Sequence, residues 1–207
     1  KIIFSDARIS VMSDEEAQKF LSYDLENTKK VSKYFKVTET ANGTTSKEVT
    51  KDEAENAFEQ AQTTRAAAHK TSYKNVQITS TNMGNNKHSV TLINRWLVTP
   101  KMKSFDVMAM RTDDASVIAG SQDGVQTYWA ASNGDYQHIY YSYNGRNMVI
   151  KDNGFGISMN LVDDASYFES DITANVNAQT EFAKVFGTYQ HAVYKVTLAQ
   201  SQAYLIS

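Results

Sequence analysis

The chain has 207 residues, of which 41% are hydrophobic and 21% are charged, and its formal net charge is −2. This length and composition suffice for one mainly β domain with a sizeable core, alone or with a small appendage. The 21 Lys and Arg residues are scattered among 23 Asp and Glu residues, which argues against the basic face of a protein that binds nucleic acid.

The chain contains no cysteine, which excludes disulfides, thiolate metal sites and cysteine nucleophiles. No run of about 18 apolar residues occurs, so no transmembrane segment is expected. The sequence begins at Lys1 without a methionine. Together with the lack of cysteine, this start favours a mature secreted protein, and we expect an extracellular location.

Residues 1–72 are expected to form a small N-terminal α/β segment, with two short helices flanking a hairpin. Two capping boxes, Ser13–Glu16 and Thr50–Glu53, each precede apolar residues at helical spacing. Between them, residues 31–50 contain two strand-like runs around an Asn-Gly turn, and both faces of this hairpin are largely polar. Residues 62–72 indicate a helix tail or a linker.

From Tyr73 onward the apolar residues alternate with a period of two, and turn signals separate many short runs. Asn144-Gly145 is the sharpest of these signals and suits a type I′ turn. Short strands at such spacing predict a mainly β fold, an antiparallel β-sandwich over residues 73–207. The expected strands are residues 73–80, 87–99, 104–111, 116–120, 125–130, 136–143, 147–151, 155–162, 172–176, 182–186, 189–198 and 203–206.

Two short sequences occur twice. Tyr-Gln-His stands at residues 136–138 and 189–191, and Asp-Asp-Ala-Ser stands at residues 113–116 and 163–166. The offsets are similar, but the residues between the repeats do not align well. An internal duplication and an independent reuse of a turn and a strand opening therefore both remain open.

The alternation places His138 and His191 on the outward or intermediate face of their strands. The opposite face of the second strand carries Ala192, Tyr194, Val196 and Leu198, which we expect in the core. Neither histidine has neighbouring ligands at metal-binding spacing, so no metal and no other cofactor is predicted. Acidic pairs in loops, such as Asp113-Asp114 and Asp163-Asp164, leave calcium binding as an alternative.

Aromatic residues on two adjacent expected strands give the best indication of a function. Outward rings on a sheet can stack on sugar faces, with nearby amide and carboxylate groups as hydrogen-bond partners, or they can lie at a membrane interface. The plainer interpretation is that half of these rings are core and the rest cover the sheet edge. The candidate ligand-binding residues are Trp129, Asn133, Asp135, Tyr136, His138 and Tyr140.

Four motifs resemble a loosely defined group of uncharacterised secreted proteins of Gram-positive bacteria. They are Arg-Trp-x-x-x-Pro at residues 95–100, Ser-Phe-Asp-Val-Met-Ala at 104–109, Gly-Phe-Gly-Ile-Ser-Met-Asn-Leu at 154–161 and Gly-Thr-Tyr-Gln-His-Ala at 187–192. The resemblance covers roughly residues 89–207. It implies secretion and a compact all-β domain, and it brings no catalytic residues.

No nucleophile elbow, glycine-rich phosphate loop or other catalytic motif occurs, so we do not expect an enzyme. The sequence favours a secreted, non-catalytic binding or interaction protein whose partner is a cell-surface glycan or a protein. The alternative is a membrane-acting β-sandwich, either pore-forming or lipid-binding, because the strands are rich in Tyr, Ser and Thr.

Overall fold

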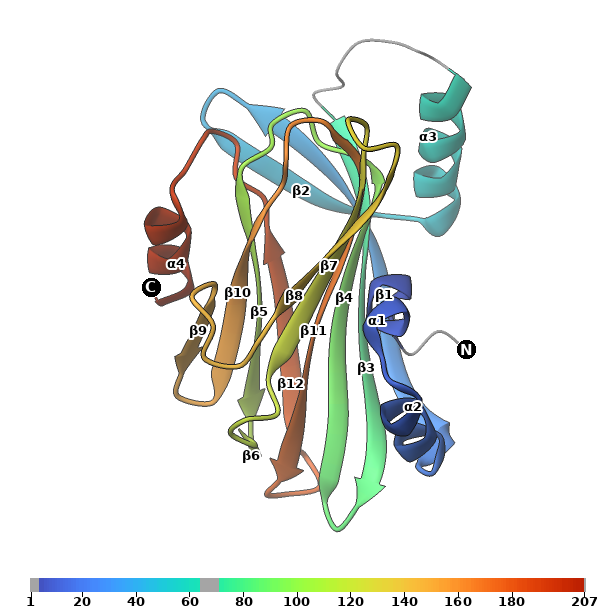
Figure 1. Ribbon diagram of the computed structural model, residues 1–207, viewed down its shortest axis with the longest axis vertical. Coiled ribbons are helices and arrows are strands. Elements are labelled where there is room, and N and C mark those ends of the chain that lie inside the picture. The colour runs from blue at the N-terminus through green and yellow to red at the C-terminus, as the bar shows by residue number, and fades with distance from the viewer. Residues whose placement is uncertain (1–3, 64–70, 207) are drawn as a thin grey trace.

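The computed structural model describes residues 4–63 and 71–206, and they form two antiparallel sheets that pack face to face (Figure 1). The larger sheet has the strand order β2-β1-β3-β4-β11-β7-β8, with β6 paired to β11, and the smaller has the order β12-β5-β10-β9. The predicted β-sandwich is confirmed. The strands are β1 (Asp24–Thr40), β2 (Gly43–Val49), β3 (Thr71–Gly84), β4 (Lys87–Val98), β5 (Phe105–Asp113), β6 (Ala115–Val117), β7 (Asp123–Ala130), β8 (Asp135–Tyr141), β9 (Met148–Lys151), β10 (Gly154–Asn160), β11 (Ala165–Ala178) and β12 (Lys184–Gln190).

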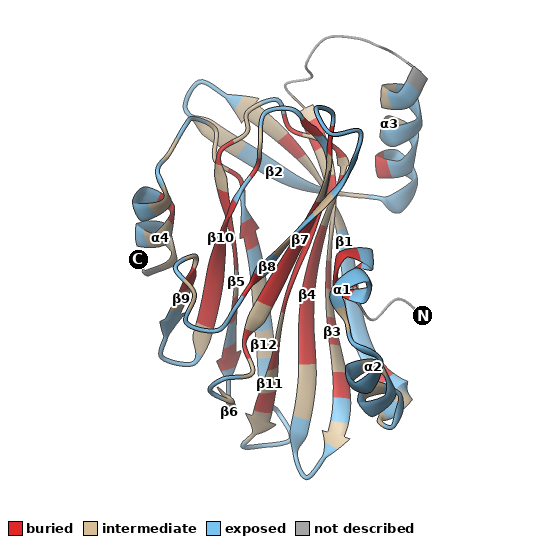
Figure 2. Ribbon diagram, viewed as in Figure 1, coloured by how far each residue is buried: buried red, intermediate tan, exposed pale blue. Residues whose placement is uncertain are grey.

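The core lies between the two sheets, and the central strands β4, β10 and β11 carry buried residues in unbroken runs (Figure 2). Leu92 and Ile172 from the large sheet and Met108 and Ile157 from the small sheet are completely buried. Gly187 lets β12 approach closely, because a Cβ there would lie 2.7 Å from a methyl carbon of Leu92. Strand β12 therefore packs closely against β3 and β4 of the large sheet at this point.

Four helices lie outside the sandwich: α1 (Asp6–Val11), α2 (Asp14–Leu21), α3 (Lys51–Thr63) and α4 (Leu198–Ile206). Ser5 caps α1, and Ser13 with Glu16 forms the predicted capping box of α2. The first helix contacts β11 and β7, whereas α4 packs on β5, β9 and β10 of the small sheet. The two sheets thus each receive a helix from one end of the chain.

The N-terminal hairpin is continuous with the large sheet. Strand β1 pairs with β2 on one side and with β3 on the other, with register partners from Asp24↔Asn82 to Thr38↔Thr71. The predicted arrangement of two helices, α2 and α3, around a hairpin is confirmed. The predicted linker at residues 62–72 falls mostly outside the described residues, and the boundary at residue 72 stays a prediction.

The C-terminal strand predictions are wrong. Strand β12 ends at Gln190, and residues 203–206, predicted as a strand, belong to α4. Tyr194, predicted in the core, is 66% exposed, while His191, predicted on the outward or intermediate face, is buried. The physical reason is a buried carboxylate, Asp106, which accepts hydrogen bonds from the backbone N–H of Ala192 and from the His191 ring and so turns the chain out of the sheet.

The predicted type I′ turn at Asn144-Gly145 is also wrong. Asn144 is left-handed, with φ of 57°, but this segment links β8 in the large sheet to β9 in the small one. The two-residue turn with positive φ at both positions is Asn85-Asn86, with φ of 53° and 60°, and it joins β3 to β4.

Candidate functional site

The predicted aromatic residues lie on the hairpin of β7 and β8, at the edge of the large sheet. The register places Trp129 opposite Tyr136, and places Thr127 and Val125 opposite His138 and Tyr140. Each such pair shares one face of the sheet, because directly opposed residues point the same way. The side chains of Tyr136 and Tyr140 are about half exposed.

One group of these residues forms a surface that we call the Tyr136 patch: Trp129, Asn133, Asp135, Tyr136 and Tyr167. The Tyr136 ring lies 5.0 Å from the Trp129 ring at 78° and 5.8 Å from the Tyr167 ring at 84°. Asn133 and Asp135 are exposed at the adjoining turn. Tyr167 of β11 was not among the predicted residues, because sequence alternation says nothing about which strand lies beside β7.

His138 and Tyr140 belong to a different environment. The Nδ1 atom of His138 is 2.8 Å from the Thr127 hydroxyl and 3.2 Å from the hydroxyl of Ser10, at the end of α1. The hydroxyl of Tyr140 donates to Asp123, and burial, with the charge of Asp123, raises the pKa of Tyr140. The predicted site is therefore divided in the structure. Helix α1 lies beside His138 and Tyr140, and Trp129 and Tyr136 belong to the Tyr136 patch.

Helix α1 is anchored to the large sheet by the Arg8 cluster: Ser5, Arg8, Asp123 and Asp171. The guanidinium of Arg8 lies 2.6 Å from Asp171 and forms a second ion pair with Asp123, while the Ser5 hydroxyl donates to Asp171 at 2.6 Å. Burial raises the pKa of both carboxyl groups, although Arg8 opposes the shift. The cluster holds a short helix that has little stability of its own.

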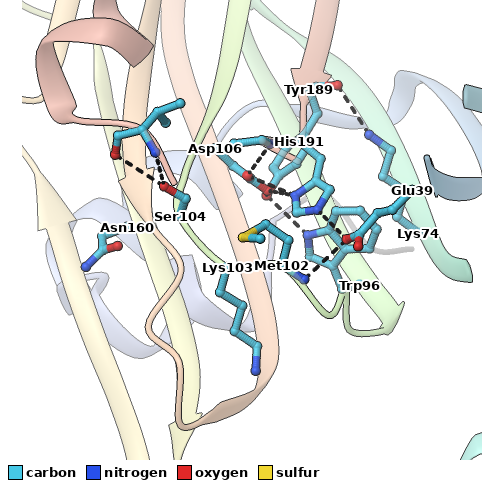
Figure 3. A network of polar contacts seen from close by, with 12 residues as sticks. Glu39, Lys74, Trp96, Met102, Lys103, Ser104, Asp106, Asn160, Tyr189 and His191 are labelled. Atoms are coloured by element: carbon cyan, nitrogen blue, oxygen red, sulfur yellow. Dashed lines mark hydrogen bonds and ion pairs between the residues drawn. The ribbon is translucent and has the colours of Figure 1, made fainter. Parts of the chain in front are cut away.

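A second buried network joins the two sheets, and we call it the His191 cluster: Glu39, Asp106, Tyr189 and His191 (Figure 3). The Nδ1 atom of His191 is 3.0 Å from both oxygens of Asp106, and its Nε2 atom is 3.0 Å from Glu39. The Tyr189 hydroxyl donates to Asp106 at 2.7 Å and accepts from the indole N–H of Trp96 at 3.2 Å. Strands β1, β4, β5 and β12 are thereby tied together at one end of the sandwich.

Burial lowers the pKa of His191, but hydrogen bonds and charges from Asp106 and Glu39 outweigh burial, so the net pKa lies above its ordinary value of 6.5. Burial and the charge of Asp106 raise the pKa of Tyr189 well above its ordinary range. Because both ring nitrogens of His191 are engaged by carboxylates, the imidazolium acts as a bridge between strands.

The raised pKa of His191 predicts a pH-dependent contribution to stability. The folded protein holds the proton more tightly than the unfolded chain, so the contribution is complete below pH about 6.5 and is lost as the pH rises through the raised pKa. Urea unfolding of the wild type and His191→Gln between pH 5.5 and 9 measures it. We expect the difference in unfolding free energy to be largest at the acid end, and a constant difference would contradict this reading.

The placement of the acidic and histidine side chains bears on the question of metal binding. Within residues 4–63 and 71–206, no three His, Asp or Glu side chains come together in a way that could hold a metal ion. Of the acidic pairs considered for calcium, Asp113-Asp114 lies at the end of β5, where Asp114 has a left-handed φ of 52°, and Asp163-Asp164 lies in a turn, where Asp163 forms an ion pair with Lys195. In the same two ranges, no helix is long and apolar enough to cross a membrane.

Sequence reasoning missed the His191 cluster, although one signal pointed to it. Asp106 stands between Phe105 and Val107 in an apolar strand, and a carboxylate at such a position requires buried donors. The two Tyr-Gln-His sequences lie in different sheets and contrasting surroundings, since His138 is exposed and His191 is buried.

The structure thus contains three distinct features: the exposed Tyr136 patch, the Arg8 cluster that holds α1 on the large sheet, and the buried His191 cluster. Comparisons with protein-family models, curated proteins and solved structures found no match to the chain. The resemblance to secreted Gram-positive proteins accordingly stays a prediction.

Proposed function

We propose that the protein is a non-catalytic, extracellular binding protein whose Tyr136 patch holds a sugar ring of a cell-surface glycan. The observation that carries the proposal is the exposed Tyr136 ring, which is 48% accessible and is fixed by ring contacts with Trp129 and Tyr167. An aromatic ring held in place loses little conformational freedom when a ligand stacks on it.

The polar part of the patch supports the same function. Asn133 and Asp135 are exposed at the turn next to Tyr136, and Asp135 accepts a hydrogen bond from the Tyr136 backbone N–H. A sugar ring presents an apolar face bordered by hydroxyl groups, so rings with adjoining amide and carboxylate groups match its chemistry. The lack of cysteine is compatible with the extracellular setting in this proposal.

Binding of the wild type and variants to a glycan array tests this function. We expect Tyr136→Ala to abolish most of the signal, because it removes the exposed ring and loosens Trp129 and Tyr167. Tyr140→Ala is the matched control, since Tyr140 is a similarly exposed tyrosine on the same strand but lies outside the patch. No glycan signal for the wild type, or equal loss in both variants, would rule out the glycan proposal.

A further inference from the structure

The open side of the sandwich contains an apolar groove of about 470 Å³. The large sheet extends beyond the small one, so the inner face of β1 and β2 continues past β12, the edge strand of the small sheet. Part of this face is open to solvent, since Val31 is 59% exposed. The groove is lined mainly by aliphatic and aromatic side chains, among them Val31, Phe35, Val37, Val76, Ile78 and Val185.

Lys74 is a buried cation that lines this groove together with the more exposed Lys33. Its side chain comes from the inner face of β3 and is only 5% exposed. The ammonium lies 4.5 Å from the ring centre of Tyr189, 5.6 Å from that of Trp96 and 6.0 Å from that of Phe35. Among the described residues it donates one hydrogen bond, to the backbone carbonyl of Tyr189 at 3.3 Å (Figure 3). An ammonium can donate three, so its coordination is incomplete.

The carboxylates nearest to Lys74 are committed to other donors. Asp106 accepts from the Tyr189 hydroxyl, His191 and the Ala192 backbone, and Glu39 accepts from His191 and the Met102 backbone. Lys74 forms no ion pair with any described side chain. Burial accordingly lowers the pKa of Lys74 to about 8, and the charge of Asp106 offsets this only in part.

We propose that this groove binds an amphiphile with a carboxylate head group, such as a medium-chain fatty acid, whose head contacts Lys74 and whose chain lies along the aliphatic wall. From Lys74 to Ile78 the strand advances about 13 Å, at about 3.3 Å per residue. Val76 and Ile78 lie on the same face of β3 as Lys74, and Val31 pairs with Ile78 on the neighbouring strand. The other lysine of the groove, Lys33, lies opposite Val76 and is paired with Glu48 at 3.0 Å. Lys74 is therefore the lysine left to contact an anionic head group, and the aliphatic side chains beside it can hold an alkyl chain.

Charge and geometry favour this occupant over the others. A cationic amphiphile would meet the ammonium of Lys74, and an uncharged one would leave its donors unused. An extended peptide would add to the edge of β12, but the Tyr189 carbonyl on that strand is already engaged by Lys74. The site is also separate from the Tyr136 patch, which lies on β7, β8 and β11, so the two proposals fail independently.

Titration with dodecanoate below its critical micelle concentration, by calorimetry and by tryptophan fluorescence, tests the proposal. We expect saturable binding of one molecule per chain, with dodecanol and dodecyltrimethylammonium at least about tenfold weaker. Lys74→Met should weaken dodecanoate binding by about tenfold or more while the melting temperature stays at or above that of the wild type, because a buried charge is removed.

A matched pair of surface variants controls for nonspecific binding of dodecanoate to exposed apolar residues. Val31→Asp places a carboxylate on the groove wall, whereas Ile9→Asp makes the same kind of change at an equally exposed position on α1. Only Val31→Asp should weaken dodecanoate binding. Undiminished binding by Lys74→Met, equal affinity for the cationic amphiphile, or capture of an apolar peptide without binding of dodecanoate would each overturn the proposal.

Discussion

Replacing Arg8 with methionine will lower the free energy of unfolding by about 3–5 kcal/mol, the usual cost of leaving a buried charge without its partner. Methionine keeps the apolar length of the side chain but cannot pair with Asp123 and Asp171. Asp171 is completely buried, so water cannot replace the guanidinium. Urea unfolding at neutral pH measures the loss, and amide hydrogen exchange will show that residues 5–21 lose protection first.

Arg111→Met is the matched control for this prediction. Arg111 pairs with Asp113 at 2.9 Å, but both side chains are more than half exposed, so the expected loss is below about 1 kcal/mol. A second variant, Arg8→Met with Asp171→Asn, should recover part of the stability, because it removes one of the stranded charges. If Arg8→Met costs no more than Arg111→Met, the cluster does not anchor α1.

The second large effect is expected from Asp106→Ala, which should also destabilise the fold by about 3–5 kcal/mol. The change leaves the Tyr189 hydroxyl, the His191 ring and the Ala192 backbone N–H without their acceptor in a region closed to water. Asp106→Asn retains one acceptor oxygen and similar volume, so its loss should be smaller. Chemical unfolding of both variants measures the two losses in unfolding free energy and shows which is larger.

Asp135→Ala serves as the reference for the Asp106 series. Asp135 is exposed, and its side chain accepts one hydrogen bond from the part of the chain that the structure describes, from the neighbouring backbone N–H of Tyr136. Its removal should therefore change stability by less than about 0.5 kcal/mol. A cost for Asp106→Ala within that range would mean that the His191 cluster contributes nothing to holding the two sheets together.

Much of the fold followed from local patterns. The strands between residues 73 and 160 carry apolar residues at alternate positions, and most of their predicted bounds agree with the structure to within a few residues. Helix α2 begins with a complete capping box, so its first residue can be predicted from the sequence alone. Such signals are readable because the residues that produce them are neighbours along the chain.

The misses occur where distant residues decide the outcome. Helix α1 has six residues and no periodic pattern, and it exists because Arg8 reaches carboxylates on β7 and β11. The alternation at residues 189–198 suits a strand, but Asp106 draws His191 inward and ends β12. Contacts between residues so far apart in sequence cannot be predicted from patterns of neighbouring residues.

The candidate site followed the same rule. The hairpin containing Trp129 and Tyr136 was located from sequence, because both flanking strands and their turn are local features. The contribution of Tyr167 and the separation of Tyr140 depend on strand order and on the placement of α1, which no local pattern encodes. The groove around Lys74 depends on the unequal widths of the two sheets.

The attachment of α1 to the large sheet through the Arg8 cluster has a consequence for the order in which the protein folds. Ser5 and its partner Asp171 are 166 positions apart, and Glu39 and His191 are 152 positions apart. Contacts between residues so far apart in sequence are expected to form late in folding, because closing the long loop between them costs conformational entropy before the contact can stabilise the chain. Helix α1 is thus expected to settle only after β11 is in place, and a folding intermediate without α1 would leave the Asp171 carboxylate without its partners Ser5 and Arg8.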